Sequence, residues 1–434
     1  MRAKTGLRLL VAWALYNVVL SVAAVLAAPV AAVLALFVEK RKRTLGPRLG
    51  FTDYDGAAGL SARPVWVHAL SVGEVRAAAP LVRELARRGT RPVVVSTSTL
   101  TGRQQARSLL GEHAAAVLYY PYDLYPGVAR ALARVRPAAV VLVESDIWPN
   151  FLYACHRRDI PVFLANARLS PESLRGYKRV SLFLLPFLRL FTAVCCQSEE
   201  QKERFVELGL SAVHVVPCGN TKFDEVARPA KSPEEVRDEL GIPREARVIV
   251  AGSTHPGEEE ILARVFDTLV PEFPGLCMVV APRDPNRAGD VRDVFPEGTA
   301  RTLSNSGPAG ARVLVIDRMG VLAATYAAGD VCFVGGSLVP EGGHNPLEPA
   351  AAGRPVVFGA EMSDFPEVST LLLNAGAACV VTDEKGLAEA VRSWLANPAE
   401  ARTAGLAGQR LVRFNTGASR RVADVVETVV AAWD

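Results

Sequence analysis

The glycine-rich run Gly335–Pro349, with the sequence GGSLVPEGGHNPLEP, is the strongest chemical signal in the chain. An apolar strand pattern ends at its first glycine pair, and a helix is expected to open near Asn345 with Pro346 as its first residue. Glycines let backbone amides approach a ligand, and amides at a helix start attract phosphate. Glu348 lies where it can accept hydrogen bonds from ribose hydroxyls. We predict a nucleotide site here; a turn before an ordinary capped helix is the alternative.

A second candidate is Glu74, in the segment His68–Glu74 with the sequence HALSVGE. It follows the first expected strand, Val65–Leu70, at the opening of a helix. A carboxylate in that position can take the proton from an acceptor hydroxyl, which is the work of a general base. A glutamate in a first helical turn is also electrostatically ordinary, so both interpretations stay open.

Two further acidic pairs were considered as metal or substrate ligands. Glu144 and Asp146 follow an expected strand in the segment Glu144–Asn150, ESDIWPN. They suit metal binding or polar recognition of a substrate, although metal ions usually need more ligands than two. Asp53-Tyr54-Asp55 has the form of a metal-binding DxD motif, but its position before the first core strand, beside Gly56, favours a surface turn.

Two cationic residues stand at positions suited to phosphate. Arg283 follows Pro282 at the end of an expected strand, where a guanidinium can clamp phosphate or contact a base. Lys222 lies in Gly219–Asp224, near the expected junction of two domains, and can neutralise charge on a leaving phosphate. An exposed lysine without a role is the alternative for Lys222.

These segments must be positioned by alternating strands and helices, which is the pattern of a parallel, doubly wound α/β sheet. The pattern breaks near 223–233 and then restarts, so the fold class is α/β with two Rossmann-like domains facing a cleft, where ligands bind beyond the carboxyl ends of the strands. The expected strands are Val65–Leu70, Pro92–Ser96, Ala138–Glu144, Val162–Ala165, Val248–Ala251, Leu276–Ala281, Val313–Asp317, Val331–Gly335 and Pro355–Gly359. The expected divisions are an anchor with its basic flank at 1–45, a first domain at 46–228, a second at 229–410, and a final helix at 411–434 that crosses back to the first domain.

Composition excludes several classes of function. The chain has 434 residues and a net charge of only +4, too small an excess for a dedicated nucleic-acid binder. Its seven cysteines show no CxxC or CxxH spacing, which gives no support for structural zinc and suits buried thiols in a reducing compartment.

The N-terminus predicts a membrane contact. No charged residue occurs in Leu9–Val38, which is longer than the roughly 20 residues that cross a bilayer. Basic residues precede this run, and Lys40-Arg41-Lys42-Arg43 follows it, which argues against a cleaved signal peptide. Whether the anchor spans the bilayer or lies in its interface is left open. Arg175–Phe191 mixes basic and apolar residues and suits either a headgroup contact or a core helix with a basic edge.

In combination these motifs resemble the Kdo (3-deoxy-D-manno-octulosonic acid) transferases of lipopolysaccharide assembly, which have the GT-B glycosyltransferase fold. The resemblance runs from the N-terminal anchor to about Phe365. It is carried, in order, by Ser71–Glu74, Glu144–Asn150, Asn166–Ser170, Gly219–Asp224, Pro282-Arg283 and Gly335–Pro349.

The resemblance implies an inverting, metal-independent transfer without a cofactor, from CMP-Kdo to a lipid A precursor of the lipid IVA type, at the cytoplasmic side of a bacterial inner membrane. Glu74 matches the general base of the family, and Glu144 and Lys222 match positions that stabilise the transition state. The positions that match CMP-binding segments are Pro282, Arg283, Met319, Gly320, Val321, Asn345, Pro346, Leu347 and Glu348.

The chain departs from the family pattern at three positions. Val321 replaces a usual Glu, Asp284 a usual His, and Asp146 a usual Glu, so donor binding is where we expect a difference. Two other functions stay open: a GT-B enzyme that uses a UDP-sugar, and a non-catalytic, membrane-tethered protein that binds nucleotides or sugars. The motifs fix neither the number of Kdo units added nor the acceptor's acylation.

Overall fold

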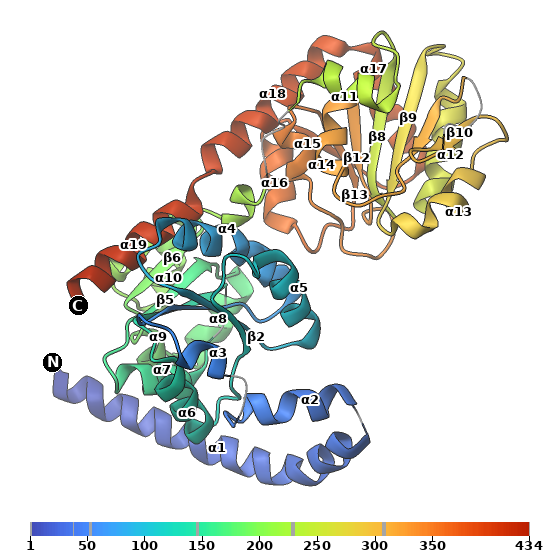
Figure 1. Ribbon diagram of the computed structural model, residues 1–434. Coiled ribbons are helices and arrows are strands. Elements are labelled where there is room, and N and C mark those ends of the chain that lie inside the picture. The colour runs from blue at the N-terminus through green and yellow to red at the C-terminus, as the bar shows by residue number, and fades with distance from the viewer. Residues whose placement is uncertain are drawn as a thin grey trace. The chain divides into compact units, whose positions relative to one another are not determined.

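The computed structural model describes residues 2–37, 39–51, 54–144, 147–226, 231–305 and 310–433, with side chains other than those of residues 2–5, 27–43 and 55. Asp53, Ser145, Asp146 and the side chains of the basic run 40–43 therefore lie outside the description. The chain forms two compact units: unit 1 is Met1–Glu225 with Thr416–Asp434, and unit 2 is Val226–Asn415. Figure 1 labels the elements of both.

Unit 1 is built on a seven-stranded parallel sheet in the order β3-β2-β1-β4-β5-β6-β7. Its central strands are rich in valine, and β1, β2, β4 and β5 are buried along their whole length, as expected where helices cover both faces of a parallel sheet. The strands are β1 (Val65–His68), β2 (Val93–Thr97), β3 (Ala116–Tyr119), β4 (Ala139–Val143), β5 (Val162–Ala167), β6 (Ala193–Cys196) and β7 (Val215–Pro217). The helices are α1 (Arg2–Phe37), α2 (Glu39–Arg48), α3 (Asp55–Ala58), α4 (Val72–Arg88), α5 (Leu100–Leu110), α6 (Tyr125–Val135), α7 (Pro149–His156), α8 (Pro171–Arg179), α9 (Ser181–Leu188), α10 (Glu199–Leu208) and α19 (Ala418–Trp433), with 3₁₀ turns η1 (Ala212–His214) and η2 (Thr221–Asp224).

Unit 2 repeats the plan with a parallel sheet in the order β10-β11-β9-β8-β12-β13-β14. The strands are β8 (Arg247–Thr254), β9 (Leu276–Pro282), β10 (Ala300–Thr302), β11 (Val313–Val315), β12 (Val331–Val334), β13 (Val356–Gly359) and β14 (Ala378–Val381). The helices are α11 (Pro233–Leu240), α12 (Glu258–Leu269), α13 (Ala288–Asp293), α14 (Leu322–Thr325), α15 (Leu347–Ala351), α16 (Pro366–Asn374), α17 (Glu384–Ala396) and α18 (Pro398–Asn415), with 3₁₀ turns η3 (Pro285–Arg287) and η4 (Tyr326–Ala328).

All nine expected strands are present, with ends that differ by three residues or fewer. Five strands were missed, namely β3, β6, β7, β10 and β14. Four of them are the outer strands of the two sheets, and β6 adjoins one of these. Outer strands are short and partly exposed, so they lack the continuous apolar run that marks a central strand.

The end of the chain returns to unit 1. We expected one continuous helix over the last stretch, but α18 ends at Asn415 and α19 begins at Ala418. Gly417 adopts φ +90°, a left-handed conformation that ends α18, and the Asp224 carboxylate accepts hydrogen bonds from the amides of Gly417 and Ser419. Asp224 thereby ties the start of α19 to η2.

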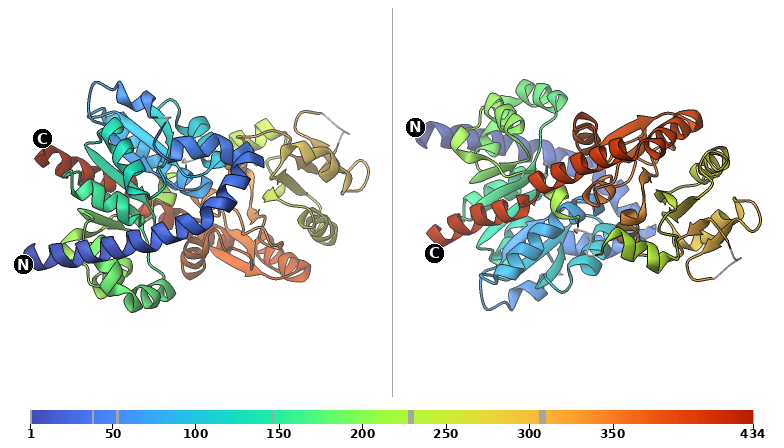
Figure 2. Two further views of the ribbon diagram at one scale, coloured as in Figure 1. Left: turned by 90° about the horizontal axis from the view of Figure 1, so that it is seen from below. Right: turned by 90° about the horizontal axis from the view of Figure 1, so that it is seen from above.

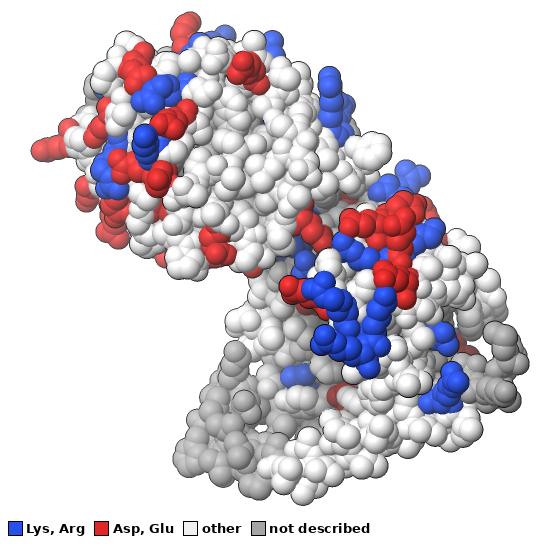
Figure 3. Space-filling model, turned by 180° about the vertical axis from the view of Figure 1, so that it is seen from behind, with Lys and Arg blue, Asp and Glu red and all other residues white. Residues whose placement is uncertain are grey.

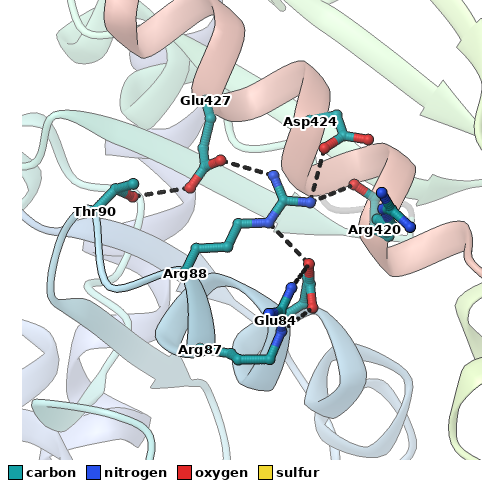
Figure 4. A network of polar contacts seen from close by, with 7 residues as sticks. All are labelled: Glu84, Arg87, Arg88, Thr90, Arg420, Asp424 and Glu427. Atoms are coloured by element: carbon teal, nitrogen blue, oxygen red, sulfur yellow. Dashed lines mark hydrogen bonds and ion pairs between the residues drawn. The ribbon is translucent and has the colours of Figure 1, made fainter.

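An ion network holds α19 against α4 (Figure 4). The Arg88 guanidinium contacts Glu84 at 2.9 Å, Asp424 at 2.8 Å and Glu427 at 2.7 Å. The Thr90 hydroxyl donates to Glu427 at 2.9 Å. The right-hand view of Figure 2 shows α19, in red, running along unit 1.

One stretch within the described residues, Gly6–Leu26 in α1, is long and apolar enough to cross a membrane, with a mean hydropathy of 2.3. Its side chains are mostly exposed. Figures 1 and 2 both show α1 lying alongside unit 1.

Candidate active site

The proposed catalytic residues of unit 1 share one edge of its sheet. All strands of this sheet are parallel, so their carboxyl ends meet at the same edge. Glu74 follows β1, Glu144 follows the neighbouring strand β4, and Lys222 follows β7. The fold therefore gathers at one edge three residues that lie far apart in the sequence.

Glu74 is half-buried in the first turn of α4. Its backbone amide donates to the Ser71 hydroxyl at 3.3 Å, which caps the helix. Its carboxylate Oε2 accepts from the amide of Leu70 at 2.6 Å, so the side chain bends back over the end of β1. The capping arrangement thus fixes the carboxylate at the sheet edge, where an acceptor hydroxyl is expected.

Two non-glycine residues at this edge have left-handed backbones. Glu144 has φ +66° and Asn166, on the adjacent strand β5, has φ +54°. Such a conformation costs roughly 1–3 kcal/mol for a residue like glutamate, and residues held in it cluster at functional sites. The Glu144 amide is held by the carbonyl of Ala165 at 2.8 Å. Strand β4 therefore ends directly before Glu144, the residue proposed to stabilise the transition state.

Buried amide side chains position the turn that carries Lys222. Asn166 Oδ1 accepts from the amide of Thr221 at 3.0 Å, and Asn220 Oδ1 accepts from the amide of Lys222 at 2.9 Å. Gln197 Nε2 donates to the carbonyl of Asn166 at 3.2 Å. The motif around Asn166 was recognised by resemblance alone, and its physical role is to attach this turn to the sheet.

The same edge carries positive charge. Burial raises the pKa of the Glu225 carboxyl, while Arg76, Arg83 and Lys222 act in the opposite direction through their charges. These cations therefore lie near Glu225, and two of them come from α4, the helix of Glu74. Sequence reasoning missed both arginines, because only the packing of η2 on α4 brings them near Lys222.

In unit 2, the proposed donor-binding segments also follow strands at one edge. Pro282 ends β9, Met319 and Val321 come after β11, and Asn345–Glu348 come after β12. Arg283 is exposed, and its amide donates to the carbonyl of Thr254 at 3.0 Å. The three segments arrive at the same side of the sheet, because its strands are all parallel.

The first amides of the glycine-rich loop contact a side chain of the protein, whereas the sequence predicted that they contact a ligand. Those of Gly336, Ser337 and Leu338 donate to the carboxylate of Glu258 at 2.7, 3.1 and 3.0 Å, and the amide of His255 donates to it at 3.0 Å. Glu258 is fully buried. These amides are occupied by the protein's own carboxylate, so the first part of the loop is a structural support.

Two histidines lie at this edge, close to the glycine-rich loop. His255 Nε2 and His344 Nε2 are 2.8 Å apart, and the rings stack with centroids 5.1 Å apart. Gly336 adopts φ +67°, and a Cβ there would lie 3.0 Å from His344, so glycine makes room for the ring. Sequence reasoning missed His255 and Glu258. Their signal was the run that directly follows β8, His255–Glu260, HPGEEE.

The second part of the loop leads into α15, where Asn345 and Glu348 are predicted to contact the nucleotide. Asn345 Oδ1 accepts from the amide of Leu347 at 3.1 Å, and Leu347 begins α15, one residue later than we expected. Glu348 is half-buried in its first turn. It lies close enough to the buried Tyr326 hydroxyl to reinforce the rise in the pKa of Tyr326 that burial causes.

The three departures from the family pattern have different surroundings. Val321 stands just before α14, and its carbonyl accepts from the amide of Thr325 at 3.0 Å. Asp284 Oδ1 accepts from the amide of Asn286 at 3.0 Å and caps η3. Asp284 is therefore a local capping residue, and Val321 offers only backbone groups of hydrogen-bonding type. Asp146 lies outside the described residues.

A cavity of about 620 Å³ in unit 2 lies at the opposite edge of the sheet. Its lining includes the first residue of β8, Arg247, and residues just before β12 and β13, Asp330 and Pro355. Ligands of such sheets bind at the carboxyl edge, so this cavity is separate from the donor segments. Within the described part of the chain, no group of three or more His, Cys, Asp or Glu side chains is placed to hold a metal ion.

Comparison with known proteins identifies the family. The sequence profile described as 3-deoxy-D-manno-octulosonic-acid transferase (kdotransferase) matches residues 43–225. The 3-deoxy-D-manno-octulosonic acid transferase of Haemophilus influenzae is 31% identical over 399 residues, which cover 89% of this chain and 91% of the relative. That of Bordetella pertussis is 33% identical and covers 84% of this chain and 87% of the relative.

The chain belongs to the Kdo transferase family. It is accordingly a glycosyltransferase.

The fold agrees with that assignment. The UDP-GlcNAc 2-epimerase of Neisseria meningitidis superposes with a TM-score of 0.58 and covers 85% of this chain and 100% of that chain, at 16% identity. At this identity the likeness concerns the fold alone. The two parallel-sheet units of this Kdo transferase have the GT-B architecture that the sequence predicted, which confirms the fold class.

Proposed function

We propose that this Kdo transferase takes Kdo from CMP-Kdo and transfers it, with inversion, to a hydroxyl of a lipid A precursor. The observation that carries the proposal is the placement of Glu74, fixed by a capping network at the same sheet edge as Glu144 and Lys222. A carboxylate, a second acid and a cation at one edge are the groups that such a transfer needs.

In the proposed reaction, Glu74 accepts the proton of a glucosamine hydroxyl on the acceptor. The hydroxyl oxygen attacks the ketosidic carbon of Kdo, and the bond from that carbon to the CMP phosphate breaks, with the electron pair leaving on CMP. The transition state has oxocarbenium character, as in glycosyl chemistry generally. Lys222 stabilises the negative charge that develops on the leaving phosphate, and Glu144 stabilises the positive charge on the sugar.

The donor is assigned to unit 2. Arg283 is exposed at the end of β9, where its guanidinium can pair with a phosphate. Asn345–Glu348 supplies a half-buried carboxylate for ribose hydroxyls, and Met319, Gly320 and Val321 contribute backbone groups. Because Val321 has no carboxylate, we expect weaker CMP binding than in relatives with Glu at this position.

The site of action is assigned to the inner leaflet of a bacterial inner membrane, on its cytoplasmic side. The long apolar stretch in α1 and the basic residues on both sides of it support a membrane contact, because anionic headgroups attract cations. An activated nucleotide donor and a lipid acceptor meet at that surface.

Nucleotide protection tests the donor assignment. A ligand at a hundred times its dissociation constant stabilises a folded protein by about 3 kcal/mol, which is a shift of roughly 5–10 °C for a domain of this size. We expect CMP to raise the unfolding temperature of unit 2 and UDP to leave it unchanged. The Arg283→Ala and Asn345→Ala variants should lose the shift. Protection by UDP without CMP would contradict the proposal and favour a UDP-sugar donor.

A further inference from the structure

One face of α1 packs against the globular part of unit 1. Leu9 and Ala12 are buried, and Trp13, Tyr16 and Asn17 are partly buried on the same face. Their spacing of three and four residues places them in one stripe along the helix. A stripe with Trp, Tyr and Asn is unusual in an apolar helix, and each of these polar groups finds a partner in the globular unit.

The partners of this stripe are Asn150 and Asp123. Trp13 Nε1 donates to Asn150 Oδ1 at 2.7 Å, and Asn17 exchanges two hydrogen bonds with the Asn150 amide at 2.9 and 3.0 Å. The Tyr16 hydroxyl donates to the Asp123 carboxylate at 2.9 Å. Both partners are themselves buried, Asn150 completely and Asp123 with 6% of its surface exposed. These are specific contacts of a folded interface.

The opposite face of α1 is apolar and exposed. Leu7, Val11, Val18 and Val22 expose 65, 59, 61 and 56% of their surfaces. Figure 3 shows this stretch, at the lower edge of the view, as a largely uncharged surface. Such an extent of exposed apolar side chains marks a surface that is covered in the working protein.

The path of the chain restricts what covers that surface. The N-terminal half of α1 packs on the globular part of unit 1. The chain contacts that part again at Arg48, whose guanidinium donates to the carbonyl of Tyr120 at 3.2 Å. Only residues 18–47 lie between Asn17, the last residue of the α1 stripe, and Arg48. Crossing a bilayer and returning needs about 40 residues, twice the roughly 20 of one span. With both ends on the same unit, the segment is too short to cross and come back.

We propose that α1 lies in the plane of one leaflet, with its Trp13–Asn17 stripe on unit 1 and its apolar face among the acyl chains, and does not span the bilayer. The side of the membrane rests on the function proposed above; the in-plane orientation does not.

The charges at the ends of α1 fit this arrangement. Arg2, Lys4 and Arg8 precede the uncharged run Leu9–Val38, and Lys40–Arg43 follows it. Basic residues close to an apolar helix stay on the cytoplasmic side. A spanning helix would place one of these groups on the far side, whereas an in-plane helix keeps both among the anionic headgroups of the same leaflet.

A second element extends the same surface. α9 packs beside α1, where the rings of Phe183 and Phe187 lie 6.4 and 6.5 Å from that of Tyr16. Phe187 is buried, whereas Leu182 exposes 84% of its surface. The neighbouring helix α8 adds the exposed Arg175. The 175–191 segment therefore has a core contact at Phe187 and an exposed apolar side chain at Leu182, and its headgroup contact stays a prediction.

The arrangement bears on the reaction because of where α1 is attached. Asn150 lies in the first turn of α7, six positions after Glu144, at the carboxyl end of β4. The leaflet is thus held beside the segment that carries a proposed catalytic residue. An acceptor anchored by its acyl chains can then present its sugar without leaving the leaflet.

Depth measurements on the full chain in vesicles test the orientation directly. Single cysteines at Leu7, Val11, Val18 and Val22, in a Cys379→Ser background, carry nitroxide labels in vesicles with anionic phospholipid. Six of the seven native cysteines are buried, so they should not react. The four sites lie on one exposed face, so labelling should not disturb packing.

An in-plane helix predicts that all four labels lie at one depth, within about 5 Å, accessible to oxygen and shielded from a water-soluble nickel complex. A spanning helix predicts a steady change of about 22 Å from Leu7 to Val22, since each residue adds 1.5 Å, and that result would overturn the proposal. Shielding from oxygen as well would show that another protein surface covers this face, and would overturn it too. A label at Ala432, exposed on α19, gives the aqueous reference.

Topology in cells provides an independent measurement. A cysteine in place of Thr5 should resist a membrane-impermeant maleimide applied from the periplasm and react in inside-out vesicles, as a cysteine at Ala432 should. Reaction of the Thr5→Cys protein from the periplasm would show a spanning helix. Neither measurement depends on catalysis, so a failure of the proposed transferase reaction would be seen separately.

Discussion

At the scale of single residues, the chemistry is assigned to carboxylates in contrasting surroundings. Glu74 is half-buried at a sheet edge and accepts from the amide of Leu70, whereas Glu258 is fully buried and accepts from four amides. The first surrounding suits the proposed general base, and the second fixes a loop. Substitution of each therefore has a different expected result.

Glu74→Gln should lower kcat by about 10²- to 10⁴-fold with little change in KM, because a general base contributes about that factor. The amide side chain still offers an oxygen to the Leu70 amide, so the unfolding temperature should stay close to that of the wild type. Steady-state kinetics and thermal unfolding measure both, with Glu203→Gln on α10 as an exposed control. Activity within a few-fold of wild type would remove Glu74 from the catalytic role.

Glu258→Gln should destabilise unit 2 by about 2–4 kcal/mol, because one amide oxygen cannot replace a carboxylate that accepts from four buried amides. Protection by CMP should weaken as the glycine-rich loop loosens. Denaturant unfolding measures the stability. The matched control is Glu260→Gln, two residues further along. The exposed Glu260 carboxylate accepts from the amide of Gly257, so this variant should lower the free energy of unfolding by less than about 1 kcal/mol. Equal losses in the two variants would contradict this account.

The Asp123 carboxyl makes the free energy of unfolding depend on pH. Burial raises the pKa of its carboxyl to about 6, although the amides of Asn150 and Phe151 and the Tyr16 hydroxyl pull it down. The folded protein then holds this proton more tightly than the unfolded chain does. The contribution of Asp123 to the free energy of unfolding is therefore fully present below pH 4 and lost as pH rises through 6, by at most about 3 kcal/mol.

The Asp123→Asn variant should lack this contribution. The difference in unfolding free energy between wild type and variant should thus shrink as pH rises from 4 to 7, and denaturant unfolding at several pH values measures it. A difference that stays constant across this range would show that the carboxyl does not titrate as assigned.

At the scale of elements, two helices are attached to unit 1 by polar contacts that join distant parts of the chain. The network of Figure 4 holds α19 to α4 through Arg88, and the stripe on α1 holds that helix to α7 through Asn150. Neither attachment is visible in the local sequence, because the partners are more than a hundred residues apart.

Arg88→Ala should destabilise unit 1 by about 1–3 kcal/mol, because three carboxylates then converge without their cation. Hydrogen exchange should rise first in α19. The matched control is Arg87→Ala, since Arg87 has 72% of its side chain exposed and contacts Glu84 on its own helix, and its stability should stay close to that of the wild type. Equal effects from both arginines would show that the network does not hold α19.

The central strands and the edge positions of Glu74, Arg283 and Glu348 could be predicted from sequence, since apolar runs and the residues that follow them are local patterns. The contacts of Asn150 and Glu258 could not, because they depend on packing between elements. The interval of three and four residues from Leu9 to Asn17 is the signal in the sequence for the attached face of α1, and hydropathy alone does not reveal it. The break at Gly417 shows the same limit, since Asp224 in another element caps the helix after it.

At the scale of the whole molecule, a GT-B fold of the Kdo transferase family combines a proposed acceptor edge in unit 1, a proposed donor edge in unit 2 and, in unit 1, a long apolar helix that we propose contacts the membrane. Among the described residues, both departures from the family pattern, Val321 and Asp284, lie in unit 2, to which we assign the donor. We therefore expect the reaction of the family with weaker affinity for the nucleotide.

Mass spectrometry of a lipid A precursor, incubated in vesicles with the purified full chain and freshly generated CMP-Kdo in the presence of a chelator, tests the central claim most directly. A mass increase by one or more Kdo units, absent with Glu74→Gln, is the predicted result and counts the additions. An unchanged acceptor mass, under conditions where CMP protects the protein, would contradict transfer to this acceptor, and an unchanged mass without CMP protection would contradict the donor as well.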